Sequence, residues 1–278
     1  MKDYQKRLFP YAYNILGSSE DAKDAIQDVL SNFYTTEKEG IENEENYLIR
    51  SVINQSINMR KKRRKLQYGE VWLPEPVATD TADTNINMRD IVSYSMLVLL
   101  EQLNPRERAV FILKEAFGYS HEEIAVSLSC TVENSRKLLS RAKSKIKLDK
   151  QPVKLLNSAS RGVLENYISA IRSGDVHRVE SMLSKDITFF ADGGPNLNVV
   201  KKICTGAADV ANLLALVYQT YQTTQVVEIA EINHQPAFLY YKEGQLAVCQ
   251  VFELSADNTI ARINNVIDPE KLKRLDFI

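Results

Sequence analysis

The sequence predicts a multidomain chain in which two all-α helical regions are followed by an α+β domain. Apolar residues recur at helical spacing in residues 1–66 and again in residues 91–150. From about residue 185 the pattern changes to short β-rich runs separated by turn residues. Helices that precede a mostly antiparallel sheet are typical of an α+β domain, which we expect in residues 155–278. A chain of 278 residues has room for about two domains or several smaller ones.

The first helical region, residues 1–66, contains a helix that starts at Ser18 and Ser19, before two acidic residues. Its predicted inward face consists of Ala22, Ala25, Ile26, Val29, Leu30 and Phe33. A polar stretch, residues 35–46, separates it from a second helix. That helix has Leu48, Ile49, Val52, Ile53 and Ile57 at helical spacing and then enters the cationic run RKKRRK.

Residues 67–90 are predicted to be a linker, because they are polar and contain Pro74 and Pro76. Within the linker, Trp72 is the only tryptophan of the chain. A large aromatic residue in a polar connector indicates either that the linker docks on another part of the protein or that Trp72 packs on the adjoining helices.

Residues 91–150 predict a helix-turn-helix. A helix over 106–117 follows the break at Asn104 and Pro105. Ser120 with Glu123 then resembles a capping box, which opens a short helix. After a tight turn, a longer helix runs over residues 132–147. Such a second helix can lie in the major groove of DNA, which is about 12 Å wide.

On this second helix, Leu138, Leu139 and Ala142 are predicted to face the core. The side chains predicted to face outward are Glu133, Asn134, Ser135, Arg136, Lys137 and Ser140. Arg136 and Lys137 carry donors that can read guanine edges, whereas Arg141, Lys143 and Lys145 are better placed for phosphates.

In the last part of the chain, two helices separated by Gly174-Asp175 are predicted within residues 159–184, and a further helix over 207–221. The predicted strands are 187–191, 199–204, 225–233, 236–254 with a turn at Glu243-Gly244, and 259–267.

The composition argues against a membrane protein, a secreted protein and a metalloprotein. Apolar residues make up 44% of the chain and charged residues 26%, as in ordinary soluble proteins. No window approaches 18 uninterrupted apolar residues and the N-terminus does not resemble a signal peptide, so we expect a cytoplasmic protein without membrane contact. The three cysteines and three histidines are scattered, so no metal site, disulfide framework or cofactor is expected.

Positive charge is concentrated in two places although the net charge is −1. Residues 60–65 are six consecutive cations, and residues 136–150 carry seven cations against the single Asp149. Two basic stripes suggest two contacts with a polyanion, because phosphate neutralisation is local. The alternative for the first stripe is a solvated helix face.

At this point the residues resemble a known family, the sigma-70 factors of RNA polymerase, in their extracytoplasmic-function (ECF) group. Residues 21–30, DAKDAIQDVL, resemble the polymerase-clamp-binding helix of region 2. Residues 46–60, NYLIRSVINQSINMR, resemble its promoter-melting segment. Residues 99–111, LLEQLNPRERAVF, and 118–125, GYSHEEIA, resemble region 4. We therefore expect region 2 in 1–66 and region 4 in 91–150.

Three further motifs resemble the ECF subgroup with a fused C-terminal SnoaL-like domain, which has the cone-shaped α+β fold of nuclear transport factor two. They are WLPEP at 72–76, DGG at 192–194 and DPEKL at 268–272. Two departures stand out: Pro195 replaces the last glycine of Asp-Gly-Gly-Gly, and Asp268 and Glu270 stand in the Asn-Pro-Asp-Lys-Leu motif. The first removes a flexible φ and an N–H donor.

The resemblance implies a non-enzymatic protein whose partners are bacterial core RNA polymerase and promoter DNA. The implied polymerase-binding residues are Asp21, Asp24, Gln27 and Asp28. The implied DNA-binding residues are Asn54, Arg60, Lys61, Lys62, Arg63, Arg64, Ser135, Arg136, Lys137, Arg141 and Lys143. The implied interdomain regulatory residues are Trp72, Leu73, Pro74, Asp192, Gly193, Gly194, Asp268, Pro269, Lys271 and Leu272.

Within this scheme, the loop at 35–46 would capture a base flipped out of the minus-ten element, with Asn54 nearby, and Arg136 and Lys137 would read the minus-thirty-five duplex. The alternatives are simple surface solubility for the acidic helix and a helix-surface amide for Asn54.

The C-terminal domain leaves three interpretations open. It can control the sigma regions in cis by docking on them or on the linker. It can hold a small-molecule ligand near Tyr218, Tyr240 or Tyr241, although core packing explains these residues equally well. It can be an enzyme with Asp192 or His234 as general base.

For the whole chain, the alternative is a helix-turn-helix transcription regulator with a ligand-binding or weakly enzymatic domain that acts without polymerase. That interpretation leaves the acidic helix and the WLPEP motif unexplained.

Overall fold

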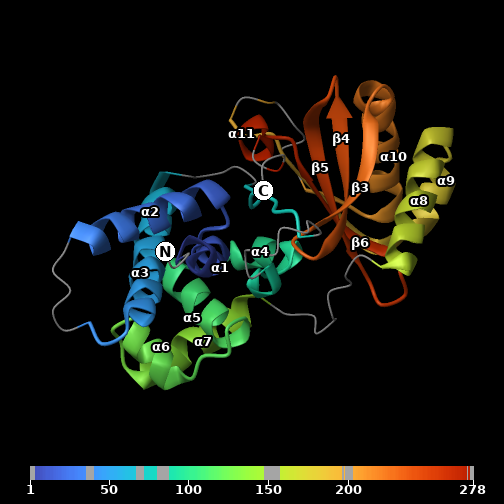
Figure 1. Cartoon of the computed structure of the whole chain (residues 1–278). Coiled ribbons are helices and arrows are strands. Elements are labelled where there is room, and N and C mark those ends of the chain that lie inside the picture. Colours follow the sequence, from blue (N-terminus) through green and yellow to red (C-terminus); the bar gives the residue numbers. More distant parts are fainter. Residues whose placement is uncertain are drawn as a thin grey trace. The chain divides into compact units, whose positions relative to one another are not determined.

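The computed structural model describes residues 4–35, 41–66, 72–79, 88–146, 157–195, 197, 203–273 and 275. The chain divides into two compact units (Figure 1). The helical unit comprises residues 1–69 and 82–149, and the sheet unit comprises residues 70–81 and 150–278. Among the helices of the described ranges, none has the length and apolarity that a membrane crossing needs.

The helical unit begins with three long helices, α1 (Tyr4–Leu16), α2 (Ser19–Thr35) and α3 (Glu44–Leu66). They pack on one another, and the apolar stripes predicted for α2 and α3 are buried except for Leu30, which is half-buried. The hydroxyl of Ser18 accepts a hydrogen bond from the Asp21 amide at 3.1 Å, which confirms the predicted helix start.

In the described part of the unit, four further helices follow a 3₁₀ turn at Met88–Asp90: α4 (Tyr94–Leu100), α5 (Pro105–Glu115), α6 (His121–Ser127) and α7 (Val132–Ile146). Asn104 and Glu107 form a capping box at the start of α5, with Pro105 as first helical residue. α5 packs on α7 and also on α3, so it connects the two halves of the unit.

The helices of the sheet unit are α8 (Ser158–Ser173), α9 (Val176–Met182), α10 (Ala207–Val217) and the four-residue α11 (Pro269–Leu272). Gly174, with φ of 72°, ends α8 in the left-handed conformation, as the predicted break requires. α10 continues as a π-helix to Gln222, so the predicted helix over 207–221 is confirmed.

The residues that the structure describes form six strands: β1 (Leu183–Asp192), β2 (Cys204–Thr205), β3 (Val226–Ile232), β4 (Gln235–Lys242), β5 (Gln245–Leu254) and β6 (Ile260–Val266). They form one sheet in the order β2-β1-β6-β5-β4-β3, in which only β1 and β6 are parallel. Of the strand predicted over 199–204, residues 199–202 lie outside the described residues.

One face of this sheet packs on the helices. Phe238 of β4 and Phe252 of β5 contact Tyr167 of α8, with ring centroids 6.0 and 5.4 Å away. α9 and α10 contact β1, whose buried Phe189 and Ala191 belong to the same core cluster as residues of these helices. Because side chains alternate along a strand, Asp192 faces the opposite side.

The segment Trp72–Thr79 lies against the sheet unit, and we call it the strap. Leu73 and Val77 are buried, and Ala78 forms an isolated antiparallel bridge with Ile232 of β3. The predicted linker therefore contains a segment that docks on the sheet unit.

α11 is formed by the DPEKL motif. Asp268 is its N-cap and accepts from the Glu270 amide at 3.0 Å, and Pro269 is its first residue. The Asp268 carboxylate also lies next to Gly194, which has φ of 64°. A glycine is needed there both for its conformation and for the close approach.

We expect Gly194→Ala to destabilise the sheet unit more than Gly244→Ala. Both glycines have positive φ, 64° and 78°, so alanine strains the backbone at either position. At Gly194 the new Cβ would lie 2.6 Å from the Asp268 carboxylate, whereas nothing lies within 4 Å at Gly244. The extra loss should be about 1–2 kcal/mol, because Asp268 must leave its N-cap position. Denaturant unfolding followed by Trp72 fluorescence measures both losses, and equal losses contradict the expectation.

Candidate functional site

The helix-turn-helix consists of α6 and α7. The Ser120 hydroxyl accepts from the Glu123 amide at 3.1 Å, and the Glu123 carboxylate accepts from the Ser120 amide at 2.7 Å, so the predicted capping box is confirmed. The hydrogen bond from the Ser120 amide to the Glu123 carboxylate is the largest cause of the lowered pKa of Glu123. α7 buries Leu138, Leu139 and Ala142, as predicted.

The cations of α7 point into solvent. Arg136 and Lys137 are about two-thirds exposed in their side chains, at 65% and 64%, and Arg141 and Lys143 are exposed as well. Their ion pairs are on the surface: Lys137 with Glu133 at 2.6 Å and Lys143 with Glu115 at 2.8 Å. Exposed pairs contribute roughly 0–1 kcal/mol, so a phosphate can replace the carboxylates at little cost.

The predicted outward position of Ser135 is wrong. Ser135 is fully buried, and its hydroxyl lies 2.8 Å from Nδ1 of His121 on α6. It stands three residues before Leu138 and four before Leu139, which places it on the buried stripe of α7. The helical spacing thus indicated a buried position for Ser135, but its polar hydroxyl group suggested a surface residue.

The acidic face of α2 is only partly open. Asp24 and Gln27 are exposed. Asp21 is half-buried and accepts from Arg63 at 2.9 Å, and Asp28 accepts from Gln55 at 2.9 Å. Asp21 therefore contributes to packing as well as to the charge of the face.

The basic run of α3 is distributed around the helix. Lys61 and Lys62 are exposed, whereas Arg60 is buried, so its predicted place on an open phosphate-binding face is wrong. Arg60 donates to the Leu16 carbonyl at 3.0 Å and to Glu101 at 2.8 Å.

Helical periodicity explains the burial of Arg60, because it follows Ile53 and Ile57 at spacings of seven and three. Arg63 is partly buried and donates to the Leu16 carbonyl at 2.7 Å as well as to Asp21. The side chains of Arg64 and Lys65 lie outside the described part of the chain, as do residues 36–40 of the predicted base-capturing loop.

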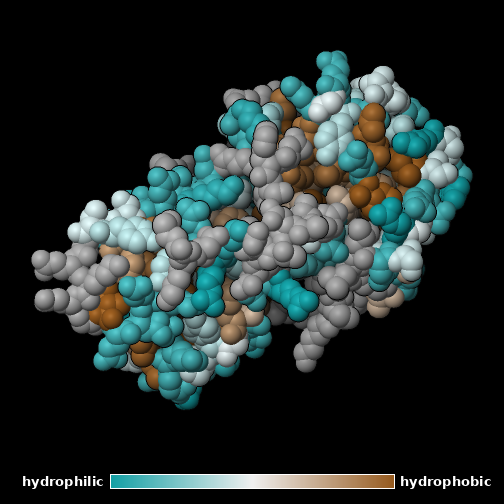
Figure 2. Space-filling view, in the orientation of Figure 1, coloured by the Kyte–Doolittle hydropathy of each residue, from teal (hydrophilic) through white to brown (hydrophobic). Residues whose placement is uncertain are grey.

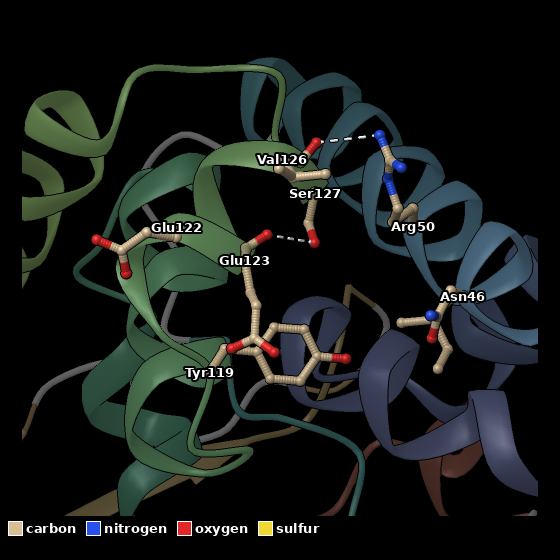
Figure 3. A pocket seen from close by; sticks show the side chains of 8 residues that line it. Asn46, Arg50, Tyr119, Glu122, Glu123, Val126 and Ser127 are labelled. Atoms are coloured by element: carbon tan, nitrogen blue, oxygen red, sulfur yellow. Dashed lines mark hydrogen bonds between the residues drawn. The ribbon is translucent and has the colours of Figure 1, made fainter.

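Asn54 lies on the surface of α3, opposite the end of α6. Its amide donates to the Arg50 carbonyl at 2.8 Å and to the Ser127 carbonyl at 3.0 Å, and Arg50 donates to the Val126 carbonyl at 3.2 Å (Figure 3). The last carbonyls of a helix lack partners within it, so these two side chains satisfy the end of α6. The simple helix-surface role considered for Asn54 therefore does not describe it fully.

A half-open cavity of about 420 Å³ lies beside these contacts. Its lining comes from α3 and from the turn and helix around α6 (Figure 3). The lining residues are Asn46, Ile49, Arg50, Tyr119, Glu122, Glu123, Val126 and Ser127.

In the sheet unit, Asp192 and Lys271 form a buried ion pair that binds the strap. Their charged atoms are 2.6 Å apart, and the side chains are only 4% and 8% exposed. The same Asp192 oxygen accepts from the Leu73 amide at 2.7 Å, and Lys271 donates to the Leu73 carbonyl at 2.6 Å. The Lys271 ammonium also lies 4.4 Å from the centre of the Trp72 ring, a cation–π contact.

The charge of Lys271 depends on its neighbours. Burial lowers the pKa of Lys271, while the carboxylate of Asp192 opposes this shift. The second oxygen of Asp192 accepts from the Gly194 amide at 2.9 Å. Three motifs far apart in the sequence, WLPEP, DGG and DPEKL, therefore meet around Asp192, with Leu272 buried behind them.

The other end of the strap is held by residues that sequence reasoning missed. The Val77 amide donates to the Asn233 side chain at 2.9 Å, and the Asn233 amide donates to the Val77 carbonyl at 2.9 Å. Thr79 donates to Glu231 at 2.9 Å. The one local signal is the Asn233-His234 turn, where both residues have positive φ.

Asp192 and His234, the two candidates for a general base, lie in different parts of the sheet. Asp192 ends β1, whereas His234 lies in the turn between β3 and β4, and β6, β5 and β4 separate β1 from β3 in the sheet. One carboxylate oxygen of Asp192 accepts from the Leu73 amide and from Lys271, and the other accepts from the Gly194 amide.

The three tyrosines considered for a pocket do not converge. Tyr218 and Tyr240 belong to the core on the helix-covered face, and Tyr240 donates to Gln250 at 3.2 Å. Burial raises the pKa of Tyr240. Tyr241 follows directly in β4 and so faces the opposite side of the sheet.

Comparisons with known proteins agree on the helical unit. Residues 1–66 match the family model for sigma-70 region 2, and residues 94–146 match that for sigma-70 region 4. The ECF RNA polymerase sigma factor SigJ of Mycobacterium tuberculosis is 25% identical over 219 residues, which cover 76% of this chain and 69% of SigJ. The probable ECF RNA polymerase sigma factor SigI of the same organism is 25% identical over 199 residues, 69% of each chain.

The crystal structure of SigJ is similar over nearly the whole chain. It has a TM-score of 0.77 at 21% identity and covers 97% of this chain and 96% of its own. The expected order of fold classes is confirmed: two all-α regions are followed by an α+β domain.

The Asp192–Lys271 pair generates a prediction. Lys271→Met leaves a buried carboxylate without its cation and should cost the sheet unit about 3 kcal/mol or more. Adding Asp192→Asn removes the orphan charge and should restore a large part of that loss. Denaturant unfolding followed by Trp72 fluorescence compares the two variants, and a double variant that is no more stable than the single one would show that the charge pairing is not the cause.

Proposed function

The chain belongs to the sigma-70 family, in its ECF group, and from this membership we propose that it binds core RNA polymerase and directs it to promoters. In this proposal region 4 reads the minus-thirty-five element, region 2 binds polymerase and the minus-ten element, and the C-terminal SnoaL-like domain controls activity in cis. The protein acts where bacterial transcription takes place, in the cytoplasm.

The observation that carries the proposal is the helix-turn-helix with its row of outward cations. α7 has 15 residues and a length of about 22 Å, enough to enter a major groove and reach the flanking backbone. Arg136 and Lys137, near its N-terminal end, are the base-reading residues, and Arg141 and Lys143 contact phosphates.

Polymerase binding is assigned to the exposed acidic face of α2, with Asp24 and Gln27 at its centre and Asp21 and Asp28 beside them. On α3, Lys61 and Lys62 are exposed and face the DNA backbone near the minus-ten element. Asn54 serves the same element once its contact with α6 is released.

Control in cis is assigned to the strap. It lies between the two sigma regions in the sequence, and its residues are hydrogen-bonded to Asp192, Lys271 and Asn233 of the C-terminal domain. Docking or release of the strap therefore changes the length of chain that is free to connect region 2 with region 4.

The helix-turn-helix regulator that acts without polymerase is not favoured, because it leaves the match to region 2 over residues 1–66 without a role.

In vitro transcription with bacterial core RNA polymerase, on the DNA upstream of the protein's own gene, tests the assignment. Arg136→Ala with Lys137→Ala should reduce promoter-specific initiation at least about tenfold, because a good base contact is worth roughly 1–3 kcal/mol. Arg161→Ala, an exposed cation of the sheet unit, is the matched control. Asp24→Ala with Gln27→Ala should weaken initiation by weakening polymerase binding. No initiation by the full chain, together with tight duplex binding by the protein alone, contradicts the sigma assignment.

The same assay tests control in cis. A chain that ends after Lys150 lacks the C-terminal domain, and Lys271→Met loosens the strap within the full chain. Both should change initiation in the same direction, by several-fold, since domain coupling is typically worth 1–3 kcal/mol. Unchanged initiation by both, at equal amounts of folded protein, contradicts control by this domain.

A further inference from the structure

The longest stretch of the chain without a charged residue lies in the sheet unit, at residues 210–227. Charged residues make up 26% of the chain, so 18 average residues would carry about five of them. The stretch covers most of α10, its π-helical continuation and the start of β3. The next longest, residues 8–19, falls largely in α1, which is mostly buried. Burial explains the lack of charge in α1, whereas α10 needs another explanation.

One side of α10 contacts the core. The buried residues recur at helical spacing: Val210, Ala211, Leu214, Ala215, Tyr218 and Gln222. Outside this stripe, Leu216 is 62% exposed and Tyr221 is 70% exposed, and Leu213 and Val217 are half-buried beside them. The solvent side of a helix normally carries charged residues. Here the other exposed residues of the stretch up to Thr224 are uncharged amides and hydroxyls: Asn212, Gln219, Thr220, Thr223 and Thr224.

Apolar side chains are exposed more often here than elsewhere in the described part of the chain. Val226 at the start of β3 is 63% exposed, so three of the eight exposed large apolar side chains of the described residues lie within residues 216–226. In Figure 2 hydrophobic side chains gather over the part of the sheet unit where Figure 1 places β3 and α10. Exposed aliphatic and aromatic residues without charge are typical of the centre of a protein interface.

The absence of charge also indicates what covers this surface. DNA is bound largely through its phosphates, and a membrane surface through cations beside apolar residues, but residues 210–227 contain no cation. A twofold axis brings a surface against a copy of itself, so a charged surface repels its copy and an uncharged one does not. The exposed side of α10 is therefore electrostatically complementary to a second copy of this chain.

We propose that α10 is a self-association surface, on which two copies of the chain pack with their α10 helices against each other around a twofold axis near Leu216. The two Leu216 side chains then meet at the axis, with Leu213 and Val217 beside them. The amides and hydroxyls of the stretch surround this apolar centre as a polar rim. None of the residues assigned to DNA or polymerase takes part, so the inference does not depend on the proposed sigma function.

The size of the surface sets the strength of the dimer. α10 has 11 residues and the π-helical turn has five, so the contact is about 22 Å long. It buries on the order of 400 Å² per copy, since a fully buried aromatic side chain alone contributes about 150–250 Å². A standard interface buries about 800 Å² per partner. We therefore expect a weak dimer, with a Kd of roughly 10 µM or above.

Sedimentation velocity of the full chain over roughly 1–500 µM measures this association. The wild-type chain should shift from monomer to dimer as its concentration rises. Leu216→Lys places two like charges at the axis and should raise the Kd at least about tenfold. Val126→Lys is the matched control, because Val126 is an aliphatic residue of α6 with 58% exposure, and it should leave the Kd unchanged. Circular dichroism checks that each variant is folded.

A mixing experiment separates a twofold contact at α10 from non-specific association. Leu216→Glu should dimerise as poorly as Leu216→Lys, but an equimolar mixture of the two should form dimers, because opposite charges then meet at the axis. A mixture that remains monomeric contradicts the twofold contact at Leu216. A wild-type chain that stays monomeric over the whole range overturns the proposal, and so does folded Leu216→Lys that dimerises as tightly as the wild type.

Discussion

The carboxylate of Glu101 is the interaction on which the helical unit depends. Two guanidinium groups from different halves of the unit are buried around it, and each also satisfies a backbone carbonyl of α1. A buried cation is costly unless it is paired, so neither arginine can be buried this way once the anion has moved. The packing of α3 on α5 is therefore conditional on one side chain of region 4.

The sheet unit also contains buried charges that are stable only because they are paired. Asp192 is buried against the Lys271 ammonium, and a single oxygen accepts from both Lys271 and the Leu73 amide of the strap. The departures from the family motifs leave this arrangement intact. Asp268 caps α11 as an asparagine would, and Gly194 keeps the positive φ while Pro195 follows it in an exposed position.

Patterns among neighbouring residues predicted the secondary structure well. Capping residues, turn glycines and apolar periodicity located α2, α6, α7 and the strands β3 to β6 from neighbouring residues alone. Arg60 and Ser135 were misplaced because residue type was weighed above helical position, although the spacing put both on buried stripes. The partner of Trp72 could not be predicted from local pattern, since Lys271 is 199 positions further along the chain and only the tertiary fold brings them together. The same holds for Glu101 with Arg60.

The polar contacts within the helical unit differ from apolar contacts in what their separation would cost. An apolar interface loses its full burial energy on separation and leaves a sticky surface, whereas separated arginines, amides and carboxylates are solvated by water or by new partners. The carbonyls at the end of α6 can exchange Asn54 and Arg50 for water, and Arg63 and Asp21 can exchange one another for phosphate and for a basic partner surface. Breaking such a contact would therefore cost only the difference between two polar environments.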